Sequence, residues 1–202
     1  MHLRARGSDR SNARISDAQR ILADITSALC FVHGSNIVHN DIKLANILYS
    51  PTRGAVLIDF GLSFVTGHPL PSGGTPWYLP PEFTENWRFR GPPSDIWALG
   101  VVMLWLLGRI PVPETTPSWS IAHIHPTGPV RAFNIDANEA MAHWHTRVDN
   151  ARLGLEGREE ALHAVVNDIL ASSINNRMTA AALEQKMVDI YRQHASEDKA
   201  RS

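Results

Sequence analysis

Two short motifs at a fixed spacing constrain this chain more than any other feature of its sequence. The first is the run His39-Asn40-Asp41-Ile42-Lys43-Leu44-Ala45-Asn46, which places a carboxylate, an ammonium and an amide within one tight loop. The second, Asp59-Phe60-Gly61, follows thirteen residues later and adds a carboxylate on a turn after an apolar run. Phosphoryl transfer needs such a set: a carboxylate to orient the attacking hydroxyl, a cation on the moving phosphate, and oxygen ligands for Mg²⁺.

The composition is that of one soluble domain. The 202 residues are 44% hydrophobic, and their formal net charge of -1 gives no field for nucleic acid or an anionic membrane. The single cysteine, Cys30, cannot form a disulfide within the chain. The N-terminus lacks an apolar signal segment, and the longest apolar run, Ile96 to Leu107, is too short to span a bilayer. We therefore expect an intracellular protein, cytoplasmic or nuclear, with no nucleic-acid or membrane partner.

Apolar periodicity predicts a mainly α-helical domain with one small β-hairpin. Ser16-Asp17-Ala18-Gln19 has capping-box spacing, and an apolar stripe follows it as far as Gly34. Two strand-like runs, 46–49 and 55–58, flank a turn-rich stretch, and the segment 62–81 is loop-like. Further helices are predicted at 95–107, 136–147, 159–171 and 179–194. Residues 1–15, with four arginines among polar residues, are expected to form a disordered basic arm, and residues 195–202 a flexible tail.

The two motifs resemble the catalytic loop and the metal-binding turn of the eukaryotic protein kinases. Three more segments resemble landmarks of that family and follow in the family's order. Gly74–Glu82 is similar to the end of an activation segment, closing as Pro-Pro-Glu where the family has Ala-Pro-Glu. Asp95–Gly100 resembles the family's central buried helix, and Asn176–Thr179 holds its late arginine. The landmarks together predict a protein-kinase-like C-terminal lobe over residues 16–194.

The resemblance implies a role for each matching residue. Asp41 would orient the acceptor hydroxyl, and Lys43 would contact the γ-phosphate. Asn46 and Asp59 would hold Mg²⁺, and Leu48 would lie beneath the adenine of ATP, so that Leu48 and Asp59 both contact the nucleotide. Seven further positions match structural residues of the family: His39, Phe60, Gly61, Thr75, Glu82, Asp95 and Arg177. Asp95 is expected to accept hydrogen bonds from the catalytic-loop backbone, and Glu82 to form a buried ion pair with Arg177.

The implied activity is Mg-ATP-dependent phosphoryl transfer to serine or threonine of a protein. The lysine two residues after Asp41 and the pair Gly74-Thr75 favour the serine/threonine branch of the family over the tyrosine branch. Asn40 stands where most of the family has an arginine that receives a phosphorylated residue of the activation segment. We therefore do not expect control through a phosphorylated Thr66 or Ser72.

Upstream of the catalytic loop the sequence departs from the family. Only 38 residues precede His39, no lysine precedes Lys43, and the only glycines there are Gly7 and Gly34. The Gly-rich hairpin and strand lysine of a β-rich N-lobe are therefore not encoded in these residues. Without those contacts nucleotide binding loses roughly 5–8 kcal/mol. We expect Mg-ATP binding by this chain alone to be weak or absent, and its activity very low or absent.

Two hypotheses from different classes follow. In the first, the chain is the catalytic lobe of a serine/threonine protein kinase whose N-lobe is supplied by another polypeptide or was lost by truncation. In the second, it is a non-catalytic, pseudokinase-like half-kinase that serves as a binding or scaffold module. Either one leaves an apolar face uncovered near Leu48, Ile58 and Phe60. We therefore expect a protein partner, or a second copy of the chain, on that face.

Overall fold

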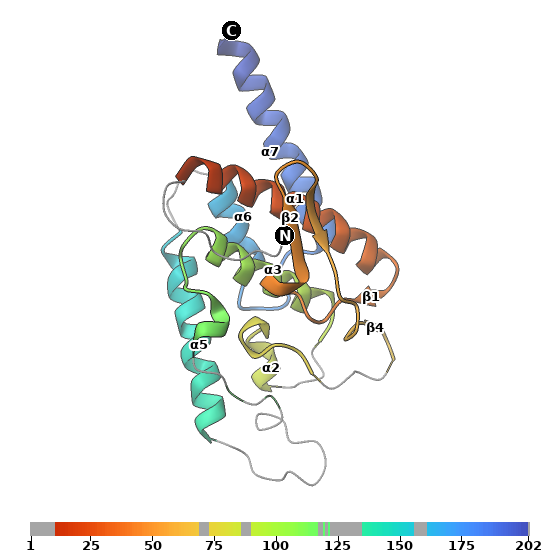
Figure 1. Cartoon of the computed structure of the whole chain (residues 1–202), viewed down its shortest axis with the longest axis vertical. Helices are drawn as coiled ribbons and strands as arrows, with labels where there is room; N and C mark the ends of the chain where they lie inside the picture. Colours follow the sequence, from red (N-terminus) through yellow and green to blue (C-terminus); the bar gives the residue numbers. More distant parts are fainter. Residues whose placement is uncertain are drawn as a thin grey trace.

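The computed structural model describes residues 11–68, 73–85, 90–116, 119, 121, 135–155 and 161–201. Helices and two small antiparallel sheets make up these regions (Figure 1). The elements are α1 (Ser11–Gly34), β1 (Ile37–Val38), η1 (Leu44–Asn46), β2 (Ile47–Ser50), β3 (Gly54–Leu57), β4 (Phe64–Val65), η2 (Pro76–Tyr78), α2 (Glu82–Glu85), α3 (Pro92–Leu106), η3 (Pro113–Thr115), α5 (Ile135–Leu153), α6 (Ala161–Ile169) and α7 (Ala180–Arg201). The predicted mainly helical class with a small β element is confirmed.

Helix α3 forms the centre of the core because its side chains are apolar on every side. A helix of this kind must be covered all round, and α1, α5 and α6 pack against it (Figure 1). Gly100 lets the end of α6 approach closely, since a Cβ at that position would lie 2.6 Å from the Leu170 side chain. Within the described part of the chain, no helix has both the length and the apolar composition to cross a membrane.

The hairpin of β2 and β3 has one face toward the core and one outward. Ile47 pairs with Leu57 on the core face, and Leu48 pairs with Val56 on the outer face. The alternation follows from the two-residue period of a strand. The hairpin was predicted, whereas the short pair β1–β4 falls partly in a segment predicted to be a loop. Two-residue strands carry too little pattern to be recognised from a sequence.

Three helix ends differ from the sequence prediction by five residues or more, and one of them is the end of α5, which lies at Leu153 and not near residue 147. Helix α1 begins at Ser11 and not at Ser16, so the predicted capping box at Ser16 is wrong. Ile15 packs against the core and extends the apolar stripe by one turn toward the N-terminus. Helix α7 continues to Arg201, beyond the predicted end at residue 194. Its last turns contain Ala, Glu, Lys and Arg, which favour helix, and no Gly or Pro to stop it. Residues 1–10 of the predicted arm lie outside the described residues.

A buried ion pair ties the segment before α3 to the C-terminal part of the fold. Arg177 Nη1 and Nη2 donate to the two carboxylate oxygens of Glu82, at 2.7 and 2.9 Å. Nη1 also donates to the Pro93 carbonyl, and the guanidinium lies 5.1 Å from the centre of the Trp97 ring. Both residues are buried. The planar guanidinium suits this two-point contact, which lysine could not reproduce.

Removing one partner of this pair should destabilise the fold strongly, because the other charge is left buried without compensation. We expect Arg177→Ala to lower the free energy of unfolding by about 3–5 kcal/mol. Thermal denaturation followed by circular dichroism measures the effect. Arg192→Ala is the control, because Arg192 has a side chain 76% exposed on α7. Equal shifts in the two variants would contradict a structural role for the buried pair.

Candidate active site

The loop from His39 to Lys43 is held by the carboxylate of Asp95 near the start of α3. Asp95 Oδ1 accepts a hydrogen bond from the Asn40 N–H, and Oδ2 accepts one from the His39 N–H, each at 2.8 Å. His33 Nε2 lies 2.9 Å from the same Oδ2. Asp95 is 1% exposed. Hydrogen bonds to a buried carboxylate are stronger than those in water, so they fix the backbone of the loop.

Asn40 and His39 complete the shape of this loop. Asn40 has φ +67°, in the left-handed region that asparagine tolerates better than most residues. Its amide nitrogen donates to the Leu62 carbonyl at 3.0 Å, which joins the loop to the segment after the Asp59-Phe60-Gly61 turn. His39 is fully buried, with its ring 4.7 Å from that of Phe60 and Nε2 at 3.1 Å from the Ile58 carbonyl. The two motifs are thereby in direct contact.

The Asp41 carboxylate lies at the centre of a closed polar cluster. Its Oδ1 accepts from the Thr75 hydroxyl at 2.7 Å. Its Oδ2 accepts from Lys43 Nζ at 2.6 Å and from Asn46 Nδ2 at 3.1 Å. Lys43 Nζ also donates to the Thr75 hydroxyl at 3.2 Å. The structure therefore brings together three residues of the first motif and Thr75, which lies 34 positions after Asp41.

Asn46 immediately precedes β2, and Asp59 comes two residues after β3. Both therefore lie at the open end of the β2–β3 hairpin. The Ile58 N–H donates to the Asn46 carbonyl at 2.9 Å, so the hairpin register sets the separation of the two residues. Asn46 Nδ2 is engaged by Asp41, which leaves the amide oxygen as the atom for a metal. Asp59 is exposed, and its Oδ1 accepts from the Gly61 N–H at 3.2 Å. An amide oxygen and a carboxylate are hard ligands that suit Mg²⁺.

The outer face of the same hairpin carries the residue predicted to lie under adenine. Leu48 is half-buried beside Val56, which is 55% exposed. Phe60, in the turn that follows the hairpin, is 48% exposed. Side chains of this kind are usually covered in a folded protein, so the face is available to a ligand or to another polypeptide.

Tyr78 links the segment after Gly73 to the catalytic loop. The Tyr78 hydroxyl donates to Glu114 Oε1 at 2.9 Å and accepts from the Leu44 N–H at 3.5 Å. Burial, with help from the nearby Glu114 carboxylate, raises the pKa of Tyr78 far above its usual value. The hydroxyl therefore stays protonated and remains a donor to Glu114.

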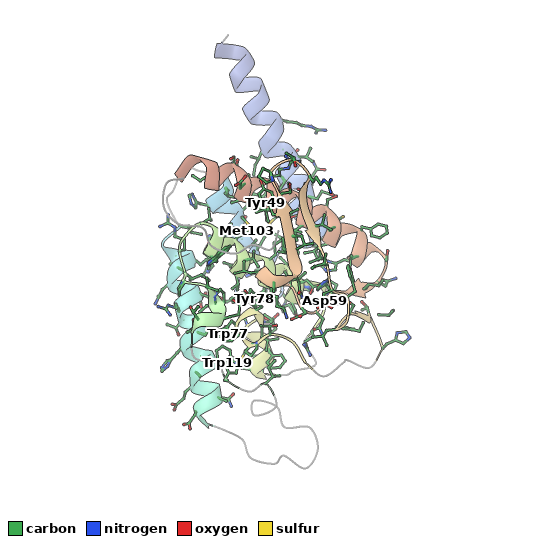
Figure 2. All side chains as sticks on the ribbon, viewed as in Figure 1. Tyr49, Asp59, Trp77, Tyr78, Met103 and Trp119 are labelled. Carbon is green, nitrogen blue, oxygen red and sulfur yellow. The ribbon has the colours of Figure 1, made fainter. Side chains whose placement is uncertain are left out.

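Helix α5 supports the same segment through two adjacent side chains. Trp144 Nε1 donates to the Trp77 carbonyl at 2.7 Å, and His145 Nε2 lies 2.9 Å from the Leu79 carbonyl. Figure 2 shows Trp77, Tyr78 and Trp119 gathered beside α5, and the rings of Trp77 and Trp119 pack edge to face. These contacts could not be predicted from the sequence, because donor and acceptor are 66 or 67 residues apart.

The two residues considered for phosphorylation differ in what the structure shows. Thr66 is exposed, and its N–H donates to the Asn36 carbonyl at 2.8 Å, continuing the short β1–β4 pairing. Ser72 lies outside the described residues. Position 40, from which the family's arginine would reach such a phosphate, presents a neutral amide bound to the Leu62 carbonyl.

Acid should destabilise the fold through His145, a buried residue of α5 next to the Leu79 carbonyl. Burial lowers the pKa of His145 below its usual value of 6.5, so the folded protein holds this ring neutral. The unfolded chain binds the proton first as pH falls below about 6.5, and stability therefore declines in that direction by at most roughly 1.4 kcal/mol per pH unit. Urea unfolding at a series of pH values measures the slope. His145→Gln should flatten it, and an unchanged slope in this variant would assign the acid sensitivity to other groups.

Comparison with known proteins gives a result independent of this geometry. The family model described as "Protein kinase domain" matches residues 2–188. The chain is 36% identical over 99 residues to the "Probable serine/threonine-protein kinase KIN1 homolog" of Encephalitozoon cuniculi, covering 47% of this chain and 18% of that protein. It is 38% identical over 100 residues to serine/threonine-protein kinase SIK2 of Gallus gallus, covering 48% and 12%. It is 35% identical over 108 residues to CBL-interacting protein kinase 25 of Oryza sativa subsp. japonica, covering 50% and 21%. The match thus spans no more than 21% of any of these three relatives.

Proposed function

This chain belongs to the protein kinase domain family, and we propose that it forms the C-terminal lobe of a serine/threonine protein kinase. The proposed reaction is transfer of the γ-phosphoryl group of Mg-ATP to a serine or threonine hydroxyl of a protein. The observation that carries the proposal is the closed cluster of Asp41, Lys43, Asn46 and Thr75. It combines a carboxylate for the acceptor hydroxyl, a cation for the phosphoryl group and, in Asn46, an amide oxygen for a metal.

Each side chain would contribute one task. Asp41 would accept a hydrogen bond from the substrate hydroxyl and thereby orient its oxygen toward the phosphoryl group. Lys43 would place its ammonium on the transferred group, and the Thr75 hydroxyl would keep Lys43 and Asp41 in register. Asn46 and Asp59 would hold Mg²⁺, which when bound neutralises the charge that develops on the phosphate oxygens. The Asp95 carboxylate keeps the whole loop rigid while this occurs.

The acceptor hydroxyl would approach over the segment that carries Thr75 and Tyr78. Thr75 touches both Asp41 and Lys43, and Tyr78 touches the backbone of Leu44. A peptide bound to this segment would therefore hold its hydroxyl at a defined position relative to Asp41, because the segment contacts Asp41 directly. The serine/threonine assignment also agrees with the names of the relatives.

The rest of the nucleotide site would come from a β-rich lobe, either elsewhere in a longer protein or on a second polypeptide. Leu48 would supply the floor under the adenine. No lysine precedes Lys43 in these 202 residues, so the cation that the family places on the α- and β-phosphates has to come from that other lobe. The 202 residues alone should accordingly bind Mg-ATP weakly.

The catalytic proposal is tested by removing the exposed metal ligand. In a preparation of the chain that phosphorylates protein, Asp59→Ala should lower the rate of phosphoryl transfer at least about a hundredfold. The reason is that a bound metal stabilises the transition state by several kcal/mol. Phosphopeptide mapping should find serine or threonine products. Asp189→Ala, an exposed carboxylate on α7, is the matched control and should leave the rate unchanged.

Two outcomes would contradict the proposal. Undiminished transfer by the Asp59→Ala protein would assign the activity to a contaminating kinase. Absence of transfer when a complete N-lobe is present would favour the non-catalytic, pseudokinase-like alternative. The circular dichroism spectrum should be the same in all three proteins, because Asp59 is exposed and contributes little to packing.

We also propose that the outer face of the hairpin contacts another polypeptide. Val56 and Phe60 are about half exposed. Leu48 pairs with Val56 across the two strands and is partly exposed to solvent. The occupant would be the N-lobe in a complete kinase, and a second copy of the chain or another protein otherwise. Because these side chains are only about half exposed, burying the remainder stabilises an association by roughly 1 kcal/mol each, about half the value for full burial.

A charge on this face should therefore abolish association without unfolding the chain. We expect the 202-residue polypeptide to associate with itself in multi-angle light scattering, and Val56→Asp to make it monomeric. Val188→Asp on α7, another partly exposed valine, should change nothing. A wild-type chain that is monomeric without a co-purifying protein would count against this proposal.

A further inference from the structure

Arg90 lies immediately before α3 and is buried beside the catalytic loop. It is 8% exposed. Asn40, Asp41, Thr75, Arg90 and Asp95 line one shared pocket between the loop, the segment after Gly73 and α3. A buried guanidinium is costly unless other groups compensate for its lost hydration. The groups around Arg90 therefore show which contacts its buried charge makes.

Several groups among the described residues compensate the Arg90 charge. Nη2 donates to the Gly73 carbonyl, and the guanidinium lies 5.7 Å from the centre of the Phe83 ring. The Asp95 and Asp41 carboxylates attract the cation and oppose the lowering of the Arg90 pKa, which burial causes. The guanidinium thus binds the segment after residue 72 and lines the same pocket as the carboxylates of Asp41 and Asp95.

Gly74 gives the guanidinium room to approach. Gly74 has φ +122°, and a Cβ there would lie 2.7 Å from Arg90 Nη2. The next residue, Thr75, donates to Asp41. Only one residue therefore separates the carbonyl held by Arg90 from the hydroxyl that contacts the catalytic carboxylate.

Position 40 carries no charge that could perform this task. The Asn40 amide donates to the Leu62 carbonyl at 3.0 Å and belongs to the other side of the loop. Arg90 is instead the cation that reaches the segment, and it does so from the α3 side. Its acceptor in the segment is the Gly73 carbonyl.

We propose that Arg90 is a positioning residue that docks the segment from Gly73 to Leu79 onto the catalytic loop by an internal contact, so that docking needs no phosphate. The proposal rests on the proposed function, because the docked segment is the surface that would receive the peptide substrate. The guanidinium donates to a backbone carbonyl, and an aromatic ring and two carboxylates stabilise its charge.

Hydrogen exchange on the unphosphorylated chain tests this inference without requiring activity. Arg90→Met keeps the aliphatic stem and removes the charge, and Arg192→Met on α7 is the matched control. In Arg90→Met, the peptide covering residues 73–79 should exchange about tenfold faster or more, with unchanged exchange in the β2–β3 hairpin. Arg90→Lys, which keeps the charge but loses the fork, should fall between the two.

Gly74→Ala supplies a second arm through the same contact. The added methyl should displace the guanidinium and speed exchange at 73–79. In the double variant with Arg90→Met the two effects should be less than additive, because both remove one interaction. The local strain of alanine at positive φ is present in both backgrounds and cancels in this comparison.

Three results would overturn the inference. They are unchanged exchange at 73–79 in Arg90→Met, equally faster exchange in the hairpin, and protection of 73–79 in the wild type that is lost on phosphatase treatment. None of these measurements monitors phosphoryl transfer. A result that overturns the inference about Arg90 can therefore be distinguished from failure of the proposed function, which Asp59→Ala tests.

Discussion

The site depends on the buried carboxylate of Asp95. Helix α3 must be buried because it is apolar on every side, and its first turn carries Asp95 into the core with it. A carboxylate in that environment requires hydrogen-bond donors, and the N–H groups of His39 and Asn40 supply them. One desolvated charge thus specifies the conformation of the loop. The left-handed backbone of Asn40 is stabilised by the same bonds, which offset its strain.

The segment that faces the loop is held by contacts from several elements. Glu114 holds it through Tyr78, and α5 holds the carbonyls of Trp77 and Leu79. Arg90 reaches it from the start of α3. Several constraints of this kind would suit the proposed function, in which an irregular segment has to stay in register with Asp41.

Local features of the site could be predicted from the residues themselves, whereas the long-range contacts that were predicted, those of Asp95 and of Glu82 with Arg177, came from the resemblance to a family. The spacing of Asp41 and Asn46 and the alternation around Leu48 are encoded within a few residues, and the resemblance to a family supplied the pairing of Glu82 with Arg177. The contacts of Arg90 and α5 were missed, since they depend on how helices pack and nothing near either partner in the sequence signals the other. Helix ends were misplaced by several residues where Ser, Ala, Glu and Lys suit both helix and coil.

The hydrogen bonds around Asp41 agree with its proposed role of receiving a substrate hydroxyl while the cluster keeps its shape. A carboxylate offers about four acceptor positions. Among the described residues, three are taken by Thr75, Lys43 and Asn46 through their side chains. By this count one position remains, and a substrate hydroxyl bound there, as proposed, would not have to displace a structural donor. The donors that orient Asp41 also reduce the reorganisation needed when the hydroxyl binds, because the carboxylate is already aligned by contacts that persist.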